Sequence, residues 1–541
     1  MPNIDRTKKT PSEAKRGIVR IASNFTRLGI TFVLGIYLVR ILLRVLGNEG
    51  LGLVSLLGSS MGLAAVLNGV LYDSSVKELA AAYHRNDQAF RETYNTSLAL
   101  SLVFGLVTSF VFVLLILLAP VLFELPKGYL GVTQTFIALQ AVRSFAAVCL
   151  VPVLNMFQVT EQMVADNLQR VVDRSTYIVA AGLTLLVQGD QVAPGSVVIY
   201  GAFQVGLAIC ANLIAAIILI VRDRRLVPSP RYISRAAMRS ILSVGAWNVS
   251  SRIASDLHLR TDNYLMNLWL GVVMGNVVFG ALAVTLTAYT RMIATGVSSG
   301  LTAVAARVST RSQDGAMQKL TYHTSRLQAV CIVPATAILL ILAEPILAVW
   351  VGNRLDDPTG ELMRVTAILV RILAIGTLCL AASESITNIL YGAGHIHRYA
   401  PYLLAGGVAN PIFSVILLVL LPDSLKFIGP ACVFSLLMII VYGWVVPRIA
   451  SRTLSIPLGQ IYTPFVRPLI LTVFCSPILM IPAIVLESWT LFWFIGVVGV
   501  FGAVYGTLCA YFVVTPDERA RVLRAVGVGR ERRPAPDEVS V

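Results

Sequence analysis

The sequence predicts an all-α membrane protein that crosses the bilayer about fourteen times, and three observations support this fold class. Of its 541 residues, 56% are hydrophobic and only 13% are charged, a composition typical of polytopic membrane proteins and not of soluble enzymes. Apolar runs of about 20 residues, long enough to span a bilayer as a helix, recur from one end of the chain to the other. Lys and Arg gather in alternate connections between these runs.

The apolar runs divide the chain into fourteen expected helices. They lie near residues 18–43, 51–80, 92–120, 131–156, 168–188, 195–221, 240–270, 276–306, 326–350, 362–391, 399–421, 427–447, 466–486 and 490–514. The first run follows a basic, polar segment, contains Arg27 and has no obvious cleavage site. We therefore interpret it as a retained first span and not as a signal peptide.

Basic residues mark the connections that follow even-numbered helices and both ends of the chain. They include Lys8, Lys9, Lys77, Arg85, Arg222, Arg224, Arg225, Arg231, Arg307, Arg311, Arg398, Arg448, Arg452, Arg519 and Arg521. The connections after odd-numbered helices carry few cations, chiefly Lys127, Arg354 and Lys426. Because Lys and Arg concentrate on the cytoplasmic side, the alternation predicts an even number of spans in the inner (cytoplasmic) membrane, with both termini cytoplasmic. It also accounts for much of the net charge of +15, so no nucleic-acid partner is needed.

The two halves of the chain are similar at a shift of 224 residues. The shift aligns Asn24 with Asn248 and Leu46-Gly47 with Leu270-Gly271, and Arg27 lands one position from Arg252. Two sets of six helices in the same orientation form a parallel repeat, a plan of secondary transporters whose site lies between the halves. We expect an N-terminal lobe at 1–222, a cytoplasmic linker at 223–239, a C-terminal lobe at 240–450, two further helices within 451–515 and a basic cytoplasmic tail at 516–541.

The seventh expected helix carries charged residues in the middle of an apolar segment. Arg252, Asp256 and Arg260 recur at four-residue intervals, so they stack on one side of the helix. A charge at the bilayer centre costs roughly 2.5–3.5 kcal/mol, whereas a helical ion pair returns about 0.2–0.5 kcal/mol in water. This side must therefore face protein or water. It either locks the helix to its neighbours or forms the wall of a hydrated transport cavity, and we favour the cavity.

Further polar residues lie inside other expected helices. As candidate substrate-binding residues we take Arg27, Arg143, Arg252, Asp256, Arg260, Asp262, Arg291, Asn24 and Asn248, and as candidate ion-coupling residues Asp256, Asp262 and Glu384. Arg170, Asp173 and Arg174 lie close enough to a helix end to reach the interface, which favours a structural role for them. The deep arginines outnumber the deep acids, and the planar guanidinium suits phosphate oxygens. An anionic head group is the simplest cargo.

The sequence lacks the common signals of an enzyme or a metalloprotein. None of the seven cysteines forms a CxxC pair, and His395 and His397 lie in an expected cytoplasmic turn. No Walker motif indicates direct use of ATP. No long periplasmic loop carries the paired carboxylates that a membrane glycosyltransferase, polymerase or ligase would need. We therefore expect no catalysis and no cofactor.

Four stretches carry a family resemblance: RVLGNEGLGLVSL at 44–56, RTDNYLMNLWLGVVMGNVVFGALAV at 260–284, EPILAVWVGN at 344–353 and NILYGAGHIHRYAPYLLAGGVANPIFSVILL at 388–418. They resemble motifs of the multidrug/oligosaccharidyl-lipid/polysaccharide (MOP) exporter superfamily, in its polysaccharide-transporter branch of Wzx-type flippases. Asp262 falls on the motif aspartate, and Leu51 replaces an aromatic residue. The resemblance implies a V-shaped, two-lobed exporter with a central cavity and two additional C-terminal helices.

The resemblance also implies a cargo, an undecaprenyl-diphosphate-linked oligosaccharide that crosses by alternating access during surface-polysaccharide assembly. Membrane lipids and the polysaccharide polymerase machinery are then the expected partners. Two alternatives share the fold. A cation-coupled multidrug exporter should line its cavity with acids and aromatic residues, and the excess of arginine counts against it. A lipid II flippase would suit arginines equally well.

Overall fold

The computed structural model describes residues 13–64, 66–298, 300–310, 315–352 and 354–514. Within the helices, the side chains of residues 13–22, 25, 63–70, 73, 243–252, 303 and 310 are also outside the description. The described residues form helices and short connections, without a β-strand among them. The predicted all-α fold class is confirmed.

Seven α-helices and two short 3₁₀ segments make up the first part of the chain. Their bounds are α1 (Glu13–Ala64), α2 (Val66–Arg85), α3 (Asp87–Leu122), α4 (Leu130–Leu154), α5 (Met156–Val159), α6 (Met163–Gln188), α7 (Gly195–Arg222), η1 (Arg224–Leu226) and η2 (Pro230–Tyr232). The expected first and second helices are joined in α1 through a backbone break at Gly47.

The second part follows the same plan, with π-helical segments inside two of its spans. It consists of α8 (Arg235–Gly271), η3 (Val272–Val284), α9 (Thr285–Ser298), α10 (Leu301–Thr310), α11 (Ala316–Ile341), α12 (Ala343–Trp350), α13 (Glu361–Gly392), α14 (Ile396–Leu420), η4 (Asp423–Ile428), α15 (Gly429–Met438), η5 (Ile439–Val445), α16 (Val446–Leu454), α17 (Leu458–Cys475), α18 (Pro477–Val485) and α19 (Leu491–Phe512). Here α8 and η3 meet at Gly271.

Eleven helical stretches of the described chain are long and apolar enough to cross a membrane. This number is compatible with about fourteen crossings. Two of the eleven stretches, Thr26–Gly62 and Ile253–Ser298, contain the breaks at Gly47 and Gly271. Helix α6 coincides with the expected fifth span but carries four charged residues, and it is not among the eleven.

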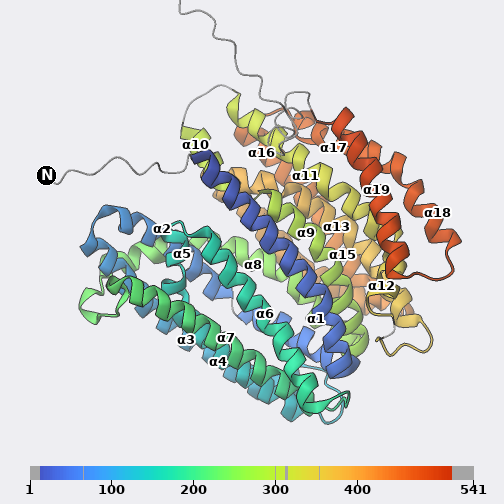
Figure 1. The fold of residues 1–541 in the computed structure, drawn as a ribbon, viewed down its shortest axis with the longest axis horizontal. Coiled ribbons are helices and arrows are strands. Elements are labelled where there is room, and N and C mark those ends of the chain that lie inside the picture. Colours follow the sequence, from blue (N-terminus) through green and yellow to red (C-terminus); the bar gives the residue numbers. More distant parts are fainter. Residues whose placement is uncertain (1–12, 65, 299, 311–314, 353, 515–541) are drawn as a thin grey trace, which may run out of the picture.

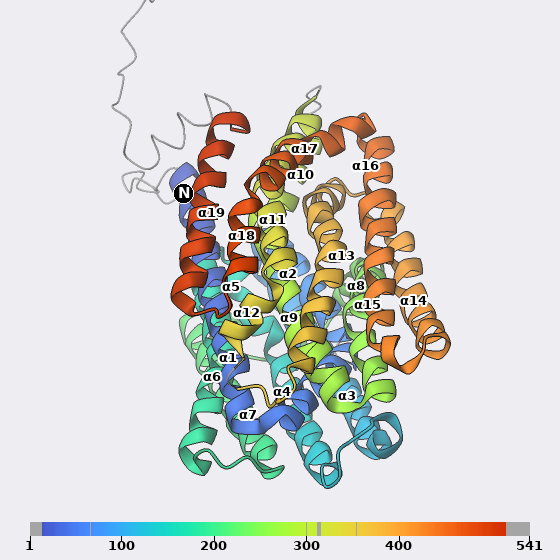
Figure 2. The same ribbon diagram turned by 90° about the vertical axis from the view of Figure 1, so that its right-hand side faces the viewer.

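The helices form two groups with a seam between them. In Figure 1, α2–α7 lie at the lower left, α11–α19 lie at the upper right, and α1, α8 and α9 run between the two groups. Helix α1 packs against α6 on one side and η3 on the other, and α2 packs against α8. Helices α17–α19 lie along the outer edge, beside α11 and α12 (Figure 2). The arrangement is the expected two-lobed plan with additional C-terminal helices.

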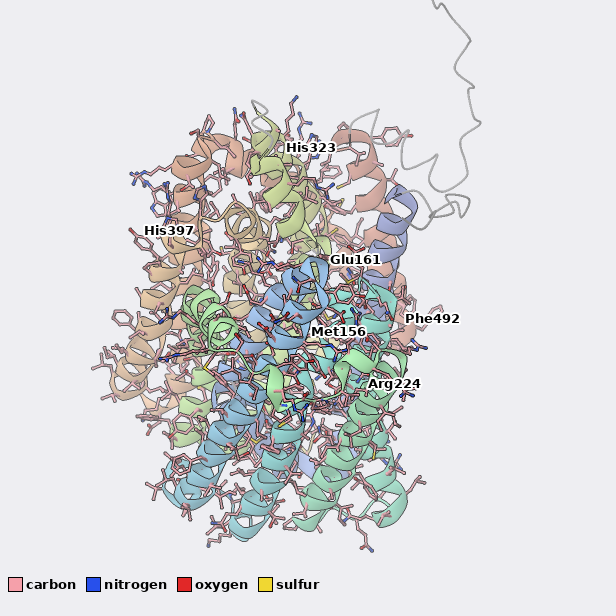
Figure 3. All side chains as sticks on the ribbon, turned by 90° about the vertical axis from the view of Figure 1, so that its left-hand side faces the viewer. Met156, Glu161, Arg224, His323, His397 and Phe492 are labelled. Carbon is pink, nitrogen blue, oxygen red and sulfur yellow. The ribbon has the colours of Figure 1, made fainter. Side chains whose placement is uncertain are left out.

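The seam is filled by side chains that are almost completely buried. Leu46, Leu53 and Leu57 of α1 pack in one core with Val277 and Leu282 of η3. Lipid tails are as apolar as these side chains, so close packing and interhelical hydrogen bonds hold such a seam together. Many large apolar side chains that are exposed lie on the outer helices, such as Phe492 in Figure 3, and they suit a surface that contacts lipid.

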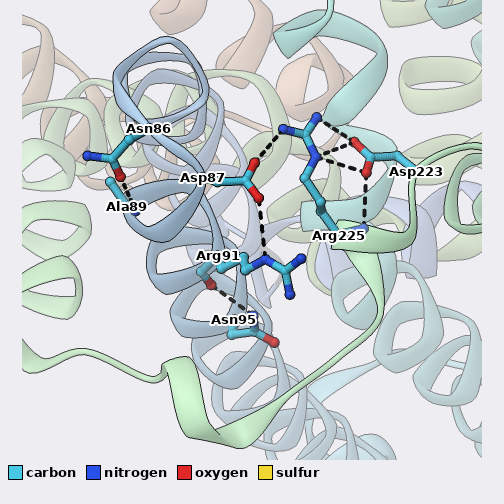
Figure 4. A network of polar contacts seen from close by, with 7 residues as sticks. All are labelled: Asn86, Asp87, Ala89, Arg91, Asn95, Asp223 and Arg225. Atoms are coloured by element: carbon cyan, nitrogen blue, oxygen red, sulfur yellow. Dashed lines mark hydrogen bonds and ion pairs between the residues drawn. The ribbon is translucent and has the colours of Figure 1, made fainter.

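The connection between the two halves is anchored to the first half by Arg225. Its guanidinium binds Asp223 at 2.7 Å and Asp87 at the start of α3 at 2.9 Å (Figure 4). The same guanidinium lies 5.1 Å from the ring centres of Tyr83 and Phe90. The linker therefore cannot separate from α2 and α3 without breaking ion pairs and cation–π contacts together.

Candidate functional site

Three adjoining cavities lie in and between the two groups of helices. The N pocket, of about 230 Å³, is lined by Val54, Gly58, Met61, Gly62, Phe112, Phe136, Gln140, Arg143, Ser144, Tyr177, Tyr200 and Gln204. The middle pocket, of about 410 Å³, shares Val54, Tyr177 and Tyr200 with it and adds Arg174 and, from the second half, Ala288 and Tyr289. The C pocket, of about 240 Å³, shares Val284 and Ala288 with the middle pocket and contains Asp256, His258, Arg260, Asp262 and Arg291.

Arg260 lies where the C pocket meets the first half of the chain. Its Nε is 2.6 Å from Asp256 Oδ1, one helical turn away, and its Nη1 donates to the Gly58 carbonyl at 3.3 Å. A side chain at Gly62 would collide with this guanidinium. Gly62 of α1 thus makes room for an arginine from α8, and Arg260 lies in the wall between the two halves.

Two arginines contact the ring of Tyr177 beside the N and middle pockets. The guanidinium carbons of Arg143 and Arg174 lie 5.0 and 5.2 Å from the centre of its ring. Arg143 is also 3.6 Å from Asp173, an ion pair at the limit of contact. The described lining of these two pockets contains no carboxylate, whereas the C pocket contains two, Asp256 and Asp262. Arginines without a carboxylate in the same described pocket lining therefore lie on the side of the first half, and Asp173 pairs with Arg143 from outside that lining.

Asp262 is buried between α8 and α14. Ser414 donates to its Oδ1 at 2.8 Å, and its Oδ2 lacks a hydrogen-bond partner among the described residues. His258, one turn earlier on α8, and Asn410, one turn earlier than Ser414 on α14, also have buried polar atoms without such a partner. No basic side chain of the described structure forms an ion pair with Asp262. Buried carboxylates normally have a partner, so this cluster could accept a cation or a proton.

The remaining candidates occupy other places. Arg291 lies on α9 and lines the C pocket. Glu384 is partly buried on α13 and lines none of the three pockets. Asn24 accepts a hydrogen bond from Asn167 of α6 at 2.8 Å, outside the pockets. The side chains of Asn248 and Arg252 lie outside the described residues.

Arg27 belongs to a separate polar cluster in the first half. Its charged neighbours are Arg170 and Asp166 of α6, which pair with each other at 3.0 Å. Tyr72 of α2 accepts hydrogen bonds from Arg170 and from Gln158. This cluster ties α1, α2 and α6 together and lines none of the three pockets.

The pockets also contain residues that the sequence reasoning missed. Arg174 was assigned a structural role because it lies near the start of an expected helix, yet it lines the middle pocket. Gln140, Gln204 and Tyr177 are uncharged, and single polar residues are common in apolar helices. The spacing of Gln140, Arg143 and Ser144 along one face of α4 was the available signal.

Hydrogen bonds between the halves close the seam at the end assigned to the periplasm. Asn267 of α8 bonds the backbone of Glu124, which follows α3, through both its oxygen (3.0 Å) and its nitrogen (3.1 Å). Trp350 donates to the Ile36 carbonyl at 2.8 Å. Asn267 also donates to Asn276 at 2.9 Å, which extends the network into η3. Glu124 and Trp350 lie at the connections after the third and ninth expected helices, which carry few cations.

Solved structures of transporters share the fold of this chain. They include an inward-facing multidrug resistance MATE family transporter of the MOP superfamily (TM-score 0.63, 16% identity, 80% of this chain and 99% of that one). The lipid II flippase MurJ in an inward closed conformation is similar as well (TM-score 0.66, 11% identity, 92% of this chain and 98% of that one). A third is a MOP superfamily transporter from Pyrococcus furiosus (TM-score 0.58, 17% identity, 80% of this chain and 97% of that one). The chain is a multi-pass membrane protein with the MOP transporter fold.

A comparison with protein-family models gives a match in the first half of the chain. Residues 14–273 match the family model described as polysaccharide biosynthesis protein. No curated protein matches the chain. The match over residues 14–273 agrees with the polysaccharide-transporter resemblance of the motifs, and the fold is shared with MOP superfamily transporters.

Proposed function

We propose that the chain is a flippase that moves an undecaprenyl-diphosphate-linked oligosaccharide across the cytoplasmic membrane, with both termini in the cytoplasm. The observation that carries the proposal is the set of arginines in the adjoining pockets: Arg143, Arg174, Arg260 and Arg291. These side chains come from both halves of a fold shared with exporters. The match to the polysaccharide biosynthesis family model favours a glycan as cargo.

A diphosphate needs such a path because it cannot enter hydrocarbon without partners. Moving an unpaired ion out of water costs several kcal/mol even after the protein relaxes. Arginine can bind phosphate oxygens through two parallel hydrogen bonds, so Arg260 is a suitable ligand at the seam. Its guanidinium is held by Asp256 at 2.6 Å. An arriving phosphate would compete with this carboxylate, which keeps binding weak enough for release.

The lipid tail can stay in the bilayer while the head group crosses. An opening between the first and eighth expected helices, α1 and α9, would let the tail pass. Phe32 and Tyr289 meet there edge to face, with ring centres 4.6 Å apart, and Tyr289 packs on Gly35. Separation of this aromatic pair would connect the middle pocket with the lipid.

Alternating access requires the periplasmic end to open. The bonds of Asn267 to Glu124 and of Trp350 to Ile36 would break in that step, and the two halves would separate as rigid groups. These bonds are intact, so with the membrane orientation predicted from the Lys and Arg alternation the conformation would be closed toward the periplasm. Cargo would then enter from the cytoplasmic side.

Asp262 is the best candidate for ion coupling among the three carboxylates considered. Asp256 is already paired with Arg260, and Glu384 lines none of the three described pockets. Asp262 is buried beside polar groups without hydrogen-bond partners. Binding of a proton or a sodium ion there would change how α8 and α14 pack, and α8 also carries Arg260.

Mass spectrometry of lipid-linked intermediates tests the proposal. Cells without the gene should accumulate an undecaprenyl-diphosphate-linked oligosaccharide, and the parental gene should clear it. Accumulation of lipid II would favour the lipid II alternative. An unchanged lipid profile with increased drug sensitivity would favour a multidrug exporter.

A further inference from the structure

Two buried glutamines face each other at the wall of the N pocket. Gln140 lies on α4 and Gln204 on α7, and they are 8% and 1% exposed. Their amide groups are 2.6 Å apart, from Gln140 Nε2 to Gln204 Oε1. In the alternative orientation of the Gln204 amide, its oxygen accepts from Arg143 Nε at 3.1 Å and Nη1 at 3.2 Å. The planar polar groups of Gln140, Gln204 and Arg143 are therefore in contact with one another.

This group has more hydrogen-bonding capacity than it uses. Each amide offers two N–H donors and a carbonyl with two lone pairs, and the guanidinium offers five donors. The contact between the amides uses one donor and one acceptor, and in the alternative orientation two donors of Arg143 also bind the Gln204 oxygen, so the N–H groups of the amides are the main remaining capacity. A buried polar group costs free energy unless it is paired, and the N pocket is the open space beside these atoms. A ligand with several closely spaced hydroxyl groups would complete the pairing.

The rest of the pocket is aromatic and small. Phe112, Phe136, Tyr177 and Tyr200 line it, and its volume is about 230 Å³. Pockets for drug-sized molecules measure roughly 300–1,000 Å³. The space therefore suits a single ring with apolar faces and a polar edge, and not a complete oligosaccharide.

We propose that the N pocket is a subsite for one pyranose residue of the glycan, with its hydroxyl groups bound by Gln140, Gln204 and Arg143. The sugar ring lies against the aromatic wall. The inference rests on the proposed function, since the sugar arrives attached to a lipid diphosphate. Gly58 lines this pocket and its carbonyl binds Arg260, so a diphosphate at Arg260 places the adjoining sugar at the pocket entrance.

A sugar fits this pocket better than a second phosphate or a drug cation. Two uncharged amides contribute no charge for a phosphate, and Arg143 has Asp173 as a neighbour at 3.6 Å. A cationic drug would meet Arg143 without a carboxylate in the described lining. Vicinal hydroxyls of a pyranose are both donors and acceptors, which matches amide groups.

The test measures binding of two defined ligands by native mass spectrometry of the purified full chain. One ligand is undecaprenyl diphosphate without sugar. The other is the complete lipid-linked oligosaccharide extracted from cells that lack the gene. The variant replaces Gln140 and Gln204 by methionine, which keeps the side-chain length and removes the amides. The control is Gln134→Met, whose amide on the same helix donates to the Ile116 carbonyl, away from the pocket.

The double variant should bind the complete oligosaccharide about tenfold more weakly, as expected from the loss of one or two net hydrogen bonds. Its binding of undecaprenyl diphosphate and that of the control should stay within about twofold of the parental protein. Equal binding of both ligands by the double variant and the parental protein would overturn the sugar subsite. If the parental protein binds neither ligand, the proposed flippase function fails instead.

Discussion

Gly47 and Gly271 lie 224 residues apart and have nearly the same backbone conformation. The dihedrals are φ 68° and ψ −175° at Gly47, and φ 72° and ψ −176° at Gly271. This region of conformational space is essentially restricted to glycine. Each glycine joins the first two expected helices of its half without a loop. The shift found in the sequence thus matches an equivalence in backbone geometry, which supports the proposed parallel repeat.

Substitution of either glycine should destabilise the protein. Gly271→Ala must place a side chain in a strained conformation, at a cost of order 1–3 kcal/mol. Gly47→Ala should cost more, because its Cβ would also lie 2.9 Å from Val192. Thermal unfolding of the purified variants measures the effect. Gly206→Ala, within α7 and with open space around it, is the control and should be neutral or stabilising. Equal melting temperatures for all three would refute the strain argument.

Loss of the seam arginines should stop export without loss of protein. Arg260→Ala removes a guanidinium that, among the described residues, is held by Asp256 and the Gly58 carbonyl, so insertion in the membrane should be normal. Arg252→Ala, at the other arginine of the same face of the seventh expected helix, should behave alike. Arg260→Lys keeps the charge but loses the bidentate geometry, and partial export is expected. The amount of surface polysaccharide and the amount of the variant protein in the membrane are measured in the same cells. If both alanine variants export at the parental level, these arginines do not bind the head group.

Removal of the Asn267 side chain should favour the state open to the periplasm. Asn267→Leu loses both bonds to Glu124 and leaves a part-buried backbone N–H and carbonyl without this partner, which costs at most about 1–3 kcal/mol for each group. Labelling of a cysteine introduced at Ser55 by a reagent that cannot cross membranes reports periplasmic access. Asn48→Ala, which loses a more exposed bond to the Asp356 carbonyl, should have a smaller effect. No increase in labelling for Asn267→Leu would argue against a latch.

Asp262→Asn should uncouple transport from its driving ion. The amide keeps the size of the side chain and its contact with Ser414 but cannot be protonated or carry charge. Flipping in vesicles should become independent of imposed proton and sodium gradients, while binding of undecaprenyl diphosphate is retained. Asp256→Asn should instead change affinity for the diphosphate, because Asp256 competes for Arg260. A gradient dependence that survives in Asp262→Asn would assign coupling to another residue.

The linker should loosen in acid. Hydrogen bonds from the Arg225 side chain hold the pKa of Asp223 below its usual value of about 3.9. A group with a lowered folded-state pKa stabilises the fold above its unfolded pKa, and that contribution is lost as the pH falls through the folded value. The protection factors of the amides of residues 223–234, which correct for the pH dependence of intrinsic exchange, should therefore fall below about pH 4 and stay constant from pH 8 to 5. In Arg225→Gln, protection should be low at every pH; high protection would contradict this assignment.

Much of the fold could be predicted because bilayer physics restricts the choices. Helix length, the alternation of Lys and Arg and the 224-residue shift are all visible in the chain, and they led to the helices observed here. The backbone breaks at Gly47 and Gly271 are hard to detect in the hydropathy of the sequence, because apolar residues continue on both sides of them. The π-helical segments η3 and η5 were likewise outside the reach of periodicity arguments, because they depend on packing in the seam.

The site was harder to predict because the position of a residue along a membrane-spanning helix does not determine what its side chain faces. Arg27 and Arg143 looked alike in the sequence, yet Arg143 lines a pocket while Arg27 lies in a cluster with Arg170 and Asp166. Arg174 seemed able to reach the interface, but it packs on Tyr177 beside the middle pocket. Which face a residue presents depends on contacts between helices that are distant in the sequence.

Flipping in reconstituted vesicles tests the central claim most directly. The purified chain is placed in vesicles with the lipid-linked oligosaccharide from cells that lack the gene, and the glycan in the outer leaflet is measured with a membrane-impermeant enzyme. We predict that the parental protein makes nearly all of the glycan accessible, whereas Arg260→Ala leaves about half protected, as in vesicles without protein. Protection of half of the glycan in the presence of the parental protein, or equal flipping by Arg260→Ala, would contradict the account.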